Sequence, residues 1–263
     1  MRGALPVGGG AGGDGSVQER SERTRRRLVH AAAEMFHRNG YASATLGEIA
    51  GAAGVTKGAL YFHFASKDEL AEAVQQRGYT LLHEEVRALR ESGASPLQAL
   101  IDITHWLARA LFEDPAVPAS FRITKECGAG PRGPVGAQSV VVDFHAAWIS
   151  VVCTLLRLAR DAGELPAADR EWEGAEALVA AVACGIEVMS GTGMPYRELQ
   201  RKVAALWARL LPGLVEAGSV RRYRARAPGG TAGGPGSGGA AEFLGAGREE
   251  AGGGAGGGAV RER

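Results

Sequence analysis

The sequence predicts an all-α protein, in which an N-terminal helix-turn-helix domain of three helices precedes a larger helical domain. Two observations favour this fold class. Runs that alternate Val, Ile or Thr with polar residues, as half-buried strands require, are missing from the sequence. Ala, Leu, Arg and Glu dominate the central part instead, and apolar residues recur there three and four positions apart, the spacing of a helix face.

Both ends of the chain are rich in glycine. Of the 40 glycines, 22 lie in residues 1–18 and 220–263, where few apolar side chains are available to build a core. We therefore predict a disordered Gly-rich segment at 1–18, a helix-turn-helix domain at 19–67, a helical domain at 68–217 and a disordered Gly/Arg-rich tail at 218–263.

Three helices are expected in the first domain. Asn39-Gly40 ends the first as a C-terminal cap. Thr45 and Glu48 form a capping box that opens the second, which Gly54 ends. The expected ranges are Arg23–Arg38, Leu46–Ala53 and Thr56–Phe62.

The larger domain is expected to open with a second capping box, Ser66 with Glu69, at the start of a long helix. A loop rich in Gly and Pro is expected at Gly128–Gly136, and Gly163 ends the helix that follows it. The remaining helices are expected at Leu97–Phe112, Pro118–Cys127, Gln138–Ala162, Arg170–Ser190 and Pro195–Glu216.

Charge is distributed unevenly along the chain, although the net charge is only +1. Residues 19–67 carry eight basic and four acidic side chains, whereas residues 68–219 carry 14 basic and 20 acidic ones. A basic front joined to an acidic body indicates that the front meets a polyanion. An ordinary mixed surface is the alternative.

Residues 45–64, TLGEIAGAAGVTKGALYFHF, form the strongest motif. Two short helices flank a turn with Gly54, which is the pattern of a helix-turn-helix whose second helix enters the major groove of DNA. Thr56 and Lys57 begin that helix, where free N–H groups and an ammonium attract phosphate. The candidate DNA-binding residues are Arg25, Thr45, Thr56, Lys57, Gly58, Ala59, Tyr61, His63 and Lys67.

Structural roles are the alternative for part of this motif. Helix pairs joined by a Gly turn are common in all-α proteins that bind no DNA. A core position is the alternative for Tyr61 and Phe62, and it is the expectation for Phe64. The arginines of residues 23–27 form either a solvated helix face or an arm along the DNA backbone.

Residues 24–70, and above all the string VTKGALYFHFASKDEL, resemble the DNA-binding domain of the TetR family of repressors. The layout of residues 20–217 is similar to the γ-butyrolactone receptor branch of that family, known from actinomycetes. The resemblance implies a homodimer that inserts paired recognition helices into a palindromic double-stranded operator. It also implies that a small molecule, bound in the C-terminal domain, releases the DNA.

The resemblance places Trp148 over the ligand, where a large flat ring with one donor suits a lactone. Receptors of the branch often have a Thr near Val182 and a Gln near Gly78, so two polar partners for the ligand's oxygens are missing here. This departure favours a pseudo-receptor that answers to antibiotics or their intermediates. The candidate ligand-binding residues are Trp148, Trp106, Phe121, Val152, Val182 and Ile186, and for all except Trp148 a place in the helical core is the favoured interpretation.

The last two helices are the expected dimer surface, because apolar residues form stripes on both. An intramolecular core is the alternative for each residue. The stripes comprise Ala177, Ala180, Ala181 and Cys184 on one helix, and Val203, Leu206, Trp207 and Leu210 on the other.

Other functional classes find little support. The six histidines form no metal-binding motif, His83-Glu84-Glu85 fits an exposed helix face, and neither a nucleophile elbow nor a phosphate loop occurs. We therefore expect no catalytic residue, metal or cofactor. A DNA-architectural protein and a TetR-type efflux regulator remain alternatives, and the basic segment 221–226 either adds DNA affinity or solubilises the chain.

The chain shows no mark of export or membrane insertion. No apolar run is long enough to cross a bilayer, and the N-terminal residues form no apolar signal region. Cys127, Cys153 and Cys184 form neither an even disulfide framework nor a Cys-x-x-Cys pair. We expect a cytoplasmic protein without a membrane partner.

Overall fold

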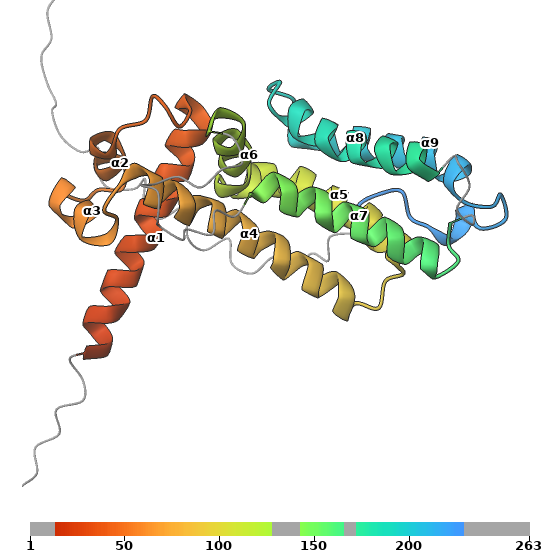
Figure 1. Cartoon of the computed structure of the whole chain (residues 1–263), viewed down its shortest axis with the longest axis horizontal. Helices are drawn as coiled ribbons and strands as arrows, with labels where there is room; N and C mark the ends of the chain where they lie inside the picture. Colours follow the sequence, from red (N-terminus) through yellow and green to blue (C-terminus); the bar gives the residue numbers. More distant parts are fainter. Residues whose placement is uncertain (1–13, 128–142, 166–171, 229–263) are drawn as a thin grey trace, which may run out of the picture. The chain divides into compact units, whose positions relative to one another are not determined.

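The structure is a computed structural model that describes residues 14–127, 143–165 and 172–228. All secondary structure in these ranges is helical, which confirms the predicted fold class. None of the described helices is both long and apolar enough to span a membrane. The helices are α1 (Asp14–Asn39), α2 (Leu46–Ala52), α3 (Lys57–His63), α4 (Lys67–Glu91), α5 (Pro96–Glu113), α6 (Ala116–Cys127), α7 (Phe144–Asp161), α8 (Trp172–Ser190), α9 (Tyr196–Leu214) and the 3-10 turn η1 (Val220–Arg222) (Figure 1).

The turns between the first helices form where the sequence predicts them. Gly40 follows α1 with a φ of +89°, and Gly54 lies between α2 and α3 with a φ of +64°, a left-handed conformation that favours glycine. Thr45 and Glu48 make both hydrogen bonds of the capping box at the start of α2. Ser66 likewise accepts from the backbone N–H of Glu69 and opens α4.

The first helix is longer than predicted. α1 begins at Asp14, well before the expected start at Arg23, so residues 14–18 belong to a helix and not to the predicted disordered segment. Gly15, Ser16 and Val17 are poor helix formers, but the good helix formers Gln18, Glu19 and Arg20 follow them, and Glu19 and Arg23 form an ion pair one turn apart, at 3.7 Å. The prediction of disorder rested on the glycines of residues 1–13, which lie outside the described residues.

The helix-turn-helix is not an independent structural unit. Leu28, Ile49 and Leu60 pack in its core, and Ala116 and Ile123 of α6 belong to the same cluster. All of these side chains are buried, and the described residues belong to one compact unit. The boundary predicted between residues 67 and 68 falls at the start of α4, but it does not coincide with a division between two hydrophobic cores.

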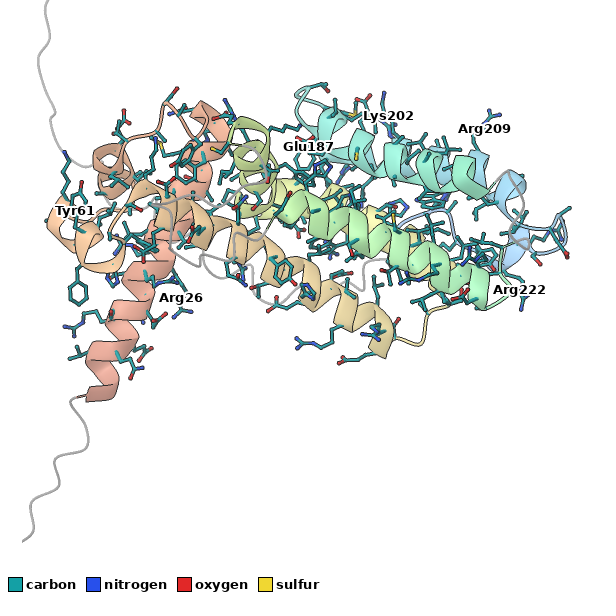
Figure 2. The ribbon with its side chains drawn as sticks, in the orientation of Figure 1. Arg26, Tyr61, Glu187, Lys202, Arg209 and Arg222 are labelled. Carbon is teal, nitrogen blue, oxygen red and sulfur yellow. The ribbon has the colours of Figure 1, made fainter. Side chains whose placement is uncertain are left out.

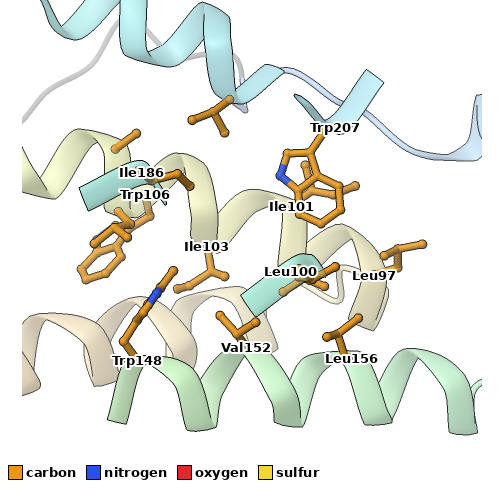
Figure 3. Packing of buried hydrophobic residues seen from close by; sticks show 14 of the residues in the cluster. Leu97, Leu100, Ile101, Ile103, Trp106, Trp148, Val152, Leu156, Ile186 and Trp207 are labelled. Atoms are coloured by element: carbon orange, nitrogen blue, oxygen red, sulfur yellow. The ribbon is translucent and has the colours of Figure 1, made fainter. Parts of the chain in front are cut away.

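α5 is the central helix of the body. It packs against α4, α7, α8 and α9, and its residues from 99 to 108 are buried without exception. Leu100, Ile103 and Leu107 lie in one apolar cluster with Val152 and Leu156 of α7 (Figure 3). Such burial on every side is unusual for a helix that carries polar residues, and it shows that something covers each face of α5.

The chain continues as ordered structure beyond the predicted end of the body. After α9, residues 219–226, which we call the strap, turn through η1 and bind α5. The strap therefore corrects the prediction that disorder begins at 218, because its hydrogen bonds to α5 offset the low apolar content of the segment. The predicted loop Gly128–Gly136 and residues 138–142, 170–171 and 229–263 lie outside the described residues.

Candidate DNA-binding and ligand-binding sites

α3 presents one face to solvent and buries the other. Leu60 is buried in the core, whereas Tyr61 is 55% and Phe62 80% exposed. Thr56 caps the helix by accepting from the backbone N–H of Ala59 at 3.1 Å. Thr56, Lys57 and Gly58 are exposed with it, while Ala59 and His63 are half-buried. Figure 2 shows Tyr61 at the outer side of α3.

The Lys57 side chain extends over the start of α2. A Cβ atom built on Gly47 would lie 2.6 Å from Lys57 Cε and 3.1 Å from its Nζ, so a larger residue at 47 would make this flexible lysine shift. The ammonium thereby stands beside the backbone of the capping box that Thr45 begins. The exposed ammonium brings a positive charge to this side of the helix pair, which suits a phosphate contact.

Thr45 is exposed but already engaged. Its hydroxyl donates to Glu48 Oε2 at 2.7 Å and accepts from the backbone N–H of Glu48 at 3.3 Å. Two bonds to the Glu48 carboxylate lower its pKa: the larger effect comes from the Thr45 hydroxyl, and the smaller from the Thr45 backbone N–H. The hydroxyl proton and the backbone N–H of Thr45 are both donated to Glu48, so Thr45 has no donor left for a phosphate and would contact DNA only as an acceptor.

Two basic residues near the motif have structural partners. Lys67 Nζ donates to the carbonyl oxygens of Tyr41, Ala42 and Ala44 at 2.9, 3.2 and 3.1 Å, and it lies over the Tyr41 ring. This use of all three ammonium protons corrects the predicted phosphate contact of Lys67. Its long side chain reaches back to the loop before α2, a contact that sequence spacing did not indicate.

Arg27 is the second basic residue near the motif that has a structural partner. It lies on α1 and donates through Nη2 to the carbonyl oxygen of Ala53, next to the left-handed Gly54. It thereby satisfies a carbonyl at the end of α2 and holds the turn. Arg25, by contrast, is exposed and places its guanidinium 5.1 Å from the centre of the Phe64 ring, which is buried as predicted. Of these two arginines only Arg25 stays available as a candidate for DNA.

Phe62 is a functional candidate that the sequence left ambiguous. Its ring is exposed beside Tyr61 and lies edge-on to His63, with centroids 5.2 Å apart. An exposed aromatic ring on a thin helix face can contact thymine methyl groups or sugars in the groove. The core position that was the alternative for Phe62 is excluded, and the helical period from Leu60 could have indicated this.

α6 connects the body to the end of α1. Arg122 Nη1 donates to the carbonyl oxygens of His37 and Arg38 at 2.6 and 3.1 Å. Glu126 Oε2 accepts from the backbone N–H groups of Tyr41 and Ala42 at 2.7 and 3.3 Å. Arg122 and Glu126 also pair with each other at 2.8 Å. Two carbonyls near the end of α1 and two amides of the loop that follows are therefore satisfied from α6.

The pKa values of Glu126 and His37 at this junction follow from burial and from the contacts of Arg122. Burial raises the pKa of Glu126, but the bonds from Arg122, Ala42 and Tyr41 outweigh it and hold that pKa below the usual value. Burial, and after it the charge of Arg122, lowers the pKa of His37. On the same helix Lys125 pairs with Glu187 of α8 at 2.6 Å. α6 thus contacts both the DNA-binding helices and the helix expected at the dimer surface.

Five of the six candidate ligand-binding residues lie in one buried cluster. Trp106 comes from α5, Phe121 from α6, Trp148 and Val152 from α7, and Ile186 from α8. Figure 3 shows Trp106 and Trp148 near each other, with Ile103 beside them. The sixth, Val182, is half-buried and does not belong to this cluster.

Trp148 differs from the other fully buried tryptophan in its hydrogen bonding. Trp207 Nε1 donates to Thr104 Oγ1 at 2.7 Å. Trp148 is equally inaccessible, but its Nε1 has no hydrogen-bond partner among the described residues. Leaving a buried donor without an acceptor costs about 1–3 kcal/mol. An acceptor atom of a bound molecule would remove that cost.

Gly78, near which the resemblance implies a Gln in the receptor branch, leaves no room for a side chain. It is buried, and a Cβ atom on it would lie 2.8 Å from Ser120 Oγ and 3.2 Å from a ring carbon of Phe144. The close approach of α4 to α6 and α7 therefore depends on glycine here. A polar ligand partner at this position is incompatible with the packing.

The residues predicted for the dimer surface divide into two groups. Val203 and Trp207 are buried within the chain, which corrects their assignment in favour of the intramolecular alternative. They face α5 because the apolar stripe of α9 is the side that packs on it. Ala177 and Ala181 are exposed, together with Leu178 and Val188 on the same helix; Ala180, Cys184, Leu206 and Leu210 are half-buried.

No group of His, Cys, Asp or Glu side chains within residues 14–127, 143–165 and 172–228 is arranged to hold a metal ion. His145 Nε2 lies 3.5 Å from Cys184 Sγ as an isolated pair. Burial raises the pKa of the Cys184 thiol, which keeps it protonated.

Comparison with known proteins points to one family. The model described as "Bacterial regulatory proteins, tetR family" matches residues 28–74. The A-factor receptor protein of Streptomyces griseus is 31% identical over 207 residues, which cover 79% of this chain and 69% of the relative.

Two solved structures are similar over most of their length. One is a γ-butyrolactone receptor described as ArpA-like, at 31% identity and a TM-score of 0.61, with 78% of this chain and 94% of that chain covered. The other is the TetR family protein CprB of Streptomyces coelicolor, in complex with its biological operator sequence. It matches at 31% identity and a TM-score of 0.64, with 77% and 94% covered.

Proposed function

Because the chain belongs to the TetR family of bacterial regulatory proteins, we propose that it is a repressor that releases operator DNA when a small molecule binds its helical body. One observation carries the DNA-binding part. α3 leaves Thr56, Lys57, Gly58, Tyr61 and Phe62 exposed along one side while Leu60 anchors the other. A thin, uncovered helix of this kind fits the major groove.

The proposed DNA contacts along α3 are of two kinds: phosphate contacts position the helix, and contacts with base edges read the sequence. Lys57, beside the start of α2, and Tyr61, further along, are proposed to contact phosphates on the two sides of the groove; the exposure of both side chains supports this. Gly58 and Phe62 lie one turn apart on the same side of α3, where small size and an exposed ring favour close approach to base edges. Arg25 extends the positive surface onto α1. Sequence preference therefore depends on few side chains, and affinity depends on phosphates and on salt.

The effector is proposed to be a mainly apolar molecule with an oxygen acceptor. The unpaired Nε1 of Trp148 favours such an acceptor, and the apolar side chains of Trp106, Phe121 and Ile186 suit a hydrocarbon tail. The named relatives are receptors of A-factor and of γ-butyrolactones, which makes a γ-butyrolactone the first candidate. The tight packing at Gly78 favours the second candidate, an antibiotic or intermediate that needs fewer polar partners.

Release of DNA is proposed to pass through α6. This helix contributes Phe121 to the cluster around Trp148, and one turn further on it holds the end of α1 through Arg122 and Glu126. A ligand that displaces Phe121 would move both contacts together. The differential affinity of the ligand for the two positions of α6 sets how far the equilibrium shifts.

A homodimer is proposed through the outer face of α8 and α9. TetR regulators are dimeric, and α8 exposes Leu178 and Val188, at 47% and 59%, together with small alanines. Residues 172–190 contain three glutamates and no Lys or Arg, whereas residues 196–214 contain four basic residues and one glutamate. α8 of one copy therefore complements α9 of the other in charge. Such a regulator would work in the cytoplasm, where its DNA is.

The test is a gel-shift titration of promoter fragments, including the DNA upstream of the protein's own gene, with and without A-factor and with extracts of producing cultures. We expect retardation at low ionic strength that one of these additions reverses. If no addition reverses the retardation, the DNA-binding part of the proposal stands and the effector part is contradicted. Release by extract but not by A-factor would favour the pseudo-receptor. Leu178→Glu should convert dimers to monomers in analytical ultracentrifugation and abolish retardation.

A further inference from the structure

Three polar residues of α5 face the strap. Gln98, Asp102 and His105 are spaced four and three residues apart, which places them on one face of the helix. Asp102 is only 6% and His105 only 3% exposed. Without the strap this stripe would be the solvent-facing side of an amphipathic helix, because α4, α7, α8 and α9 contact the remaining sides.

The strap satisfies this stripe through its backbone and one side chain. Arg224 Nη2 donates to both carboxylate oxygens of Asp102 at 3.1 Å. The Gln98 amide accepts from the backbone N–H of Arg224 at 2.8 Å and donates to its carbonyl oxygen at 3.2 Å, as a neighbouring strand would. His105 Nε2–H donates to the carbonyl oxygen of Ala225 at 2.9 Å.

A second anchor holds the strap at the start of α5. Glu164, which follows α7, accepts through one carboxylate oxygen from the backbone N–H of Leu97 at 2.8 Å. Its other oxygen accepts from the Tyr223 hydroxyl at 3.4 Å. Val220, Tyr223 and Ala225 also pack against the apolar cluster of the body. The strap is thus bonded to α5 at its N-terminus and over two further turns.

We propose that the strap is a latch that sets the position of α5, with Arg224 as its positioning residue. The contacts link the strap directly to the cluster around Trp148, because His105 bonds the strap and the next residue, Trp106, lies in that cluster. Loosening the strap frees α5 to shift, and with it Trp106. The consequence for effector binding rests on the proposed function, whereas the latch itself does not.

The first experiment measures hydrogen exchange by mass spectrometry in the full-length chain. Arg224→Ala is compared with Arg221→Ala, which removes an exposed arginine from η1 of the same strap. We expect Arg224→Ala to speed exchange about tenfold in residues 96–109 and 219–228, since a charge-assisted bond is lost. Exchange in α1 to α3 should be unchanged. Equal exchange in the two variants would overturn the latch.

A double variant distinguishes the effect of Arg224 on the position of the strap from its effect on the stability of the body. Arg224→Ala leaves the buried Asp102 carboxylate with less compensation, which destabilises the body. Adding Asp102→Asn removes that charge, so the double variant should regain melting temperature while its strap stays in fast exchange. If the double variant regains slow exchange as well, Arg224 is no positioning residue.

The second experiment compares the A-factor concentration that half-releases a retarded promoter fragment. For the double variant we expect a change of about fivefold or more against wild type, with DNA affinity in the absence of A-factor unchanged. An unchanged concentration would overturn the positioning role for effector binding. If wild type itself ignores A-factor, the proposed effector class fails, and the exchange experiment still decides the latch.

Discussion

Glu126 on α6 accepts a hydrogen bond from the backbone N–H of Tyr41 at 2.7 Å, and so fixes the loop that leads from α1 into the helix-turn-helix. The same carboxylate pairs with Arg122, which holds the last carbonyls of α1. One ion pair on the body therefore bonds both sides of this junction. Its removal has measurable consequences.

Glu126→Gln should lower stability at neutral pH by about 1 kcal/mol, since bonds to a charged acceptor are weakened but solvent screens this exposed carboxylate. The pKa of Glu126 is lowered in the folded state, so its contribution is present above the ordinary value of 4.5 and is lost as pH falls through the lowered pKa. In urea titrations the difference between wild type and variant should shrink as the solution is acidified below that value. Glu113→Gln, at an exposed ion pair with Arg109, is the control. A difference independent of pH would contradict the assignment.

Lys57→Ala should weaken binding to specific and random DNA alike, because a phosphate contact carries no base information. We expect the slope of log affinity against log salt to become shallower by about one unit. Fluorescence anisotropy at four or more salt concentrations measures it. Arg90→Ala, which removes an exposed arginine from the last turn of α4, should leave the slope unchanged. Equal slopes for all three proteins would place Lys57 outside the groove.

Gly54→Ala and Gly58→Ala should have opposite effects. Gly54 has a φ of +64°, and a Cβ atom there would lie 2.8 Å from Arg27 Nη2, so alanine should destabilise the fold by about 1–2 kcal/mol. Gly58 lies in a helix, and its Cβ would meet nothing closer than Thr56 Oγ1 at 3.9 Å. Alanine at 58 should keep or raise the melting temperature and weaken DNA binding. Unimpaired binding would show that α3 does not approach the DNA there.

Trp148→Phe and Trp207→Phe form a matched pair in the core. Replacing Trp207 removes its bond to Thr104 and should cost about 1–2 kcal/mol in addition to lost packing. Replacing Trp148 removes a donor that has no partner among the described residues, so the hydrogen-bond part of its cost should be absent. Effector-induced release should be lost in Trp148→Phe and kept in Trp207→Phe. A Trp148→Phe protein that still releases DNA would remove this indole from the effector site.

His105→Gln should make the strap less sensitive to acid. Burial lowers the pKa of His105, and the charge of Arg224 lowers it further, while the Ala225 carbonyl and Asp102 raise it. Because the folded-state pKa is depressed, the stabilisation is present above 6.5 and is lost as pH falls through the depressed value. Gln keeps a donor for Ala225 but does not titrate. Exchange of the strap at pH 7 and pH 5 should differ more in wild type than in the variant.

The local features of the fold could be predicted because short-range physics determines them. Gly40, Gly54 and the capping boxes of Thr45 and Ser66 act over four or five residues, and the helix ends formed where these signals lie. The strand-free composition likewise agrees with the described helices. The start of α1 was missed because glycines before Asp14 outweighed the helix formers after it.

Long-range partners could not be predicted in this way. Lys67 reaches carbonyls more than twenty positions earlier, Arg122 holds the end of α1, and Arg224 binds Asp102 of α5. The apolar stripe of α9 fitted a dimer surface as well as a core, and only packing against α5 decided that Trp207 is internal. Periodicity identifies which face is apolar, but not what covers it.

The central claim is that exposed α3 reads duplex DNA as one half of a twofold pair. The most direct measurement is hydroxyl-radical footprinting of a retarded promoter fragment at low ionic strength. We predict two protected half-sites whose centres lie about 10 base pairs, or a multiple of this, apart, with protection lost in Lys57→Ala. Failure to retard any promoter fragment under these conditions, or a single unpaired footprint, would contradict it.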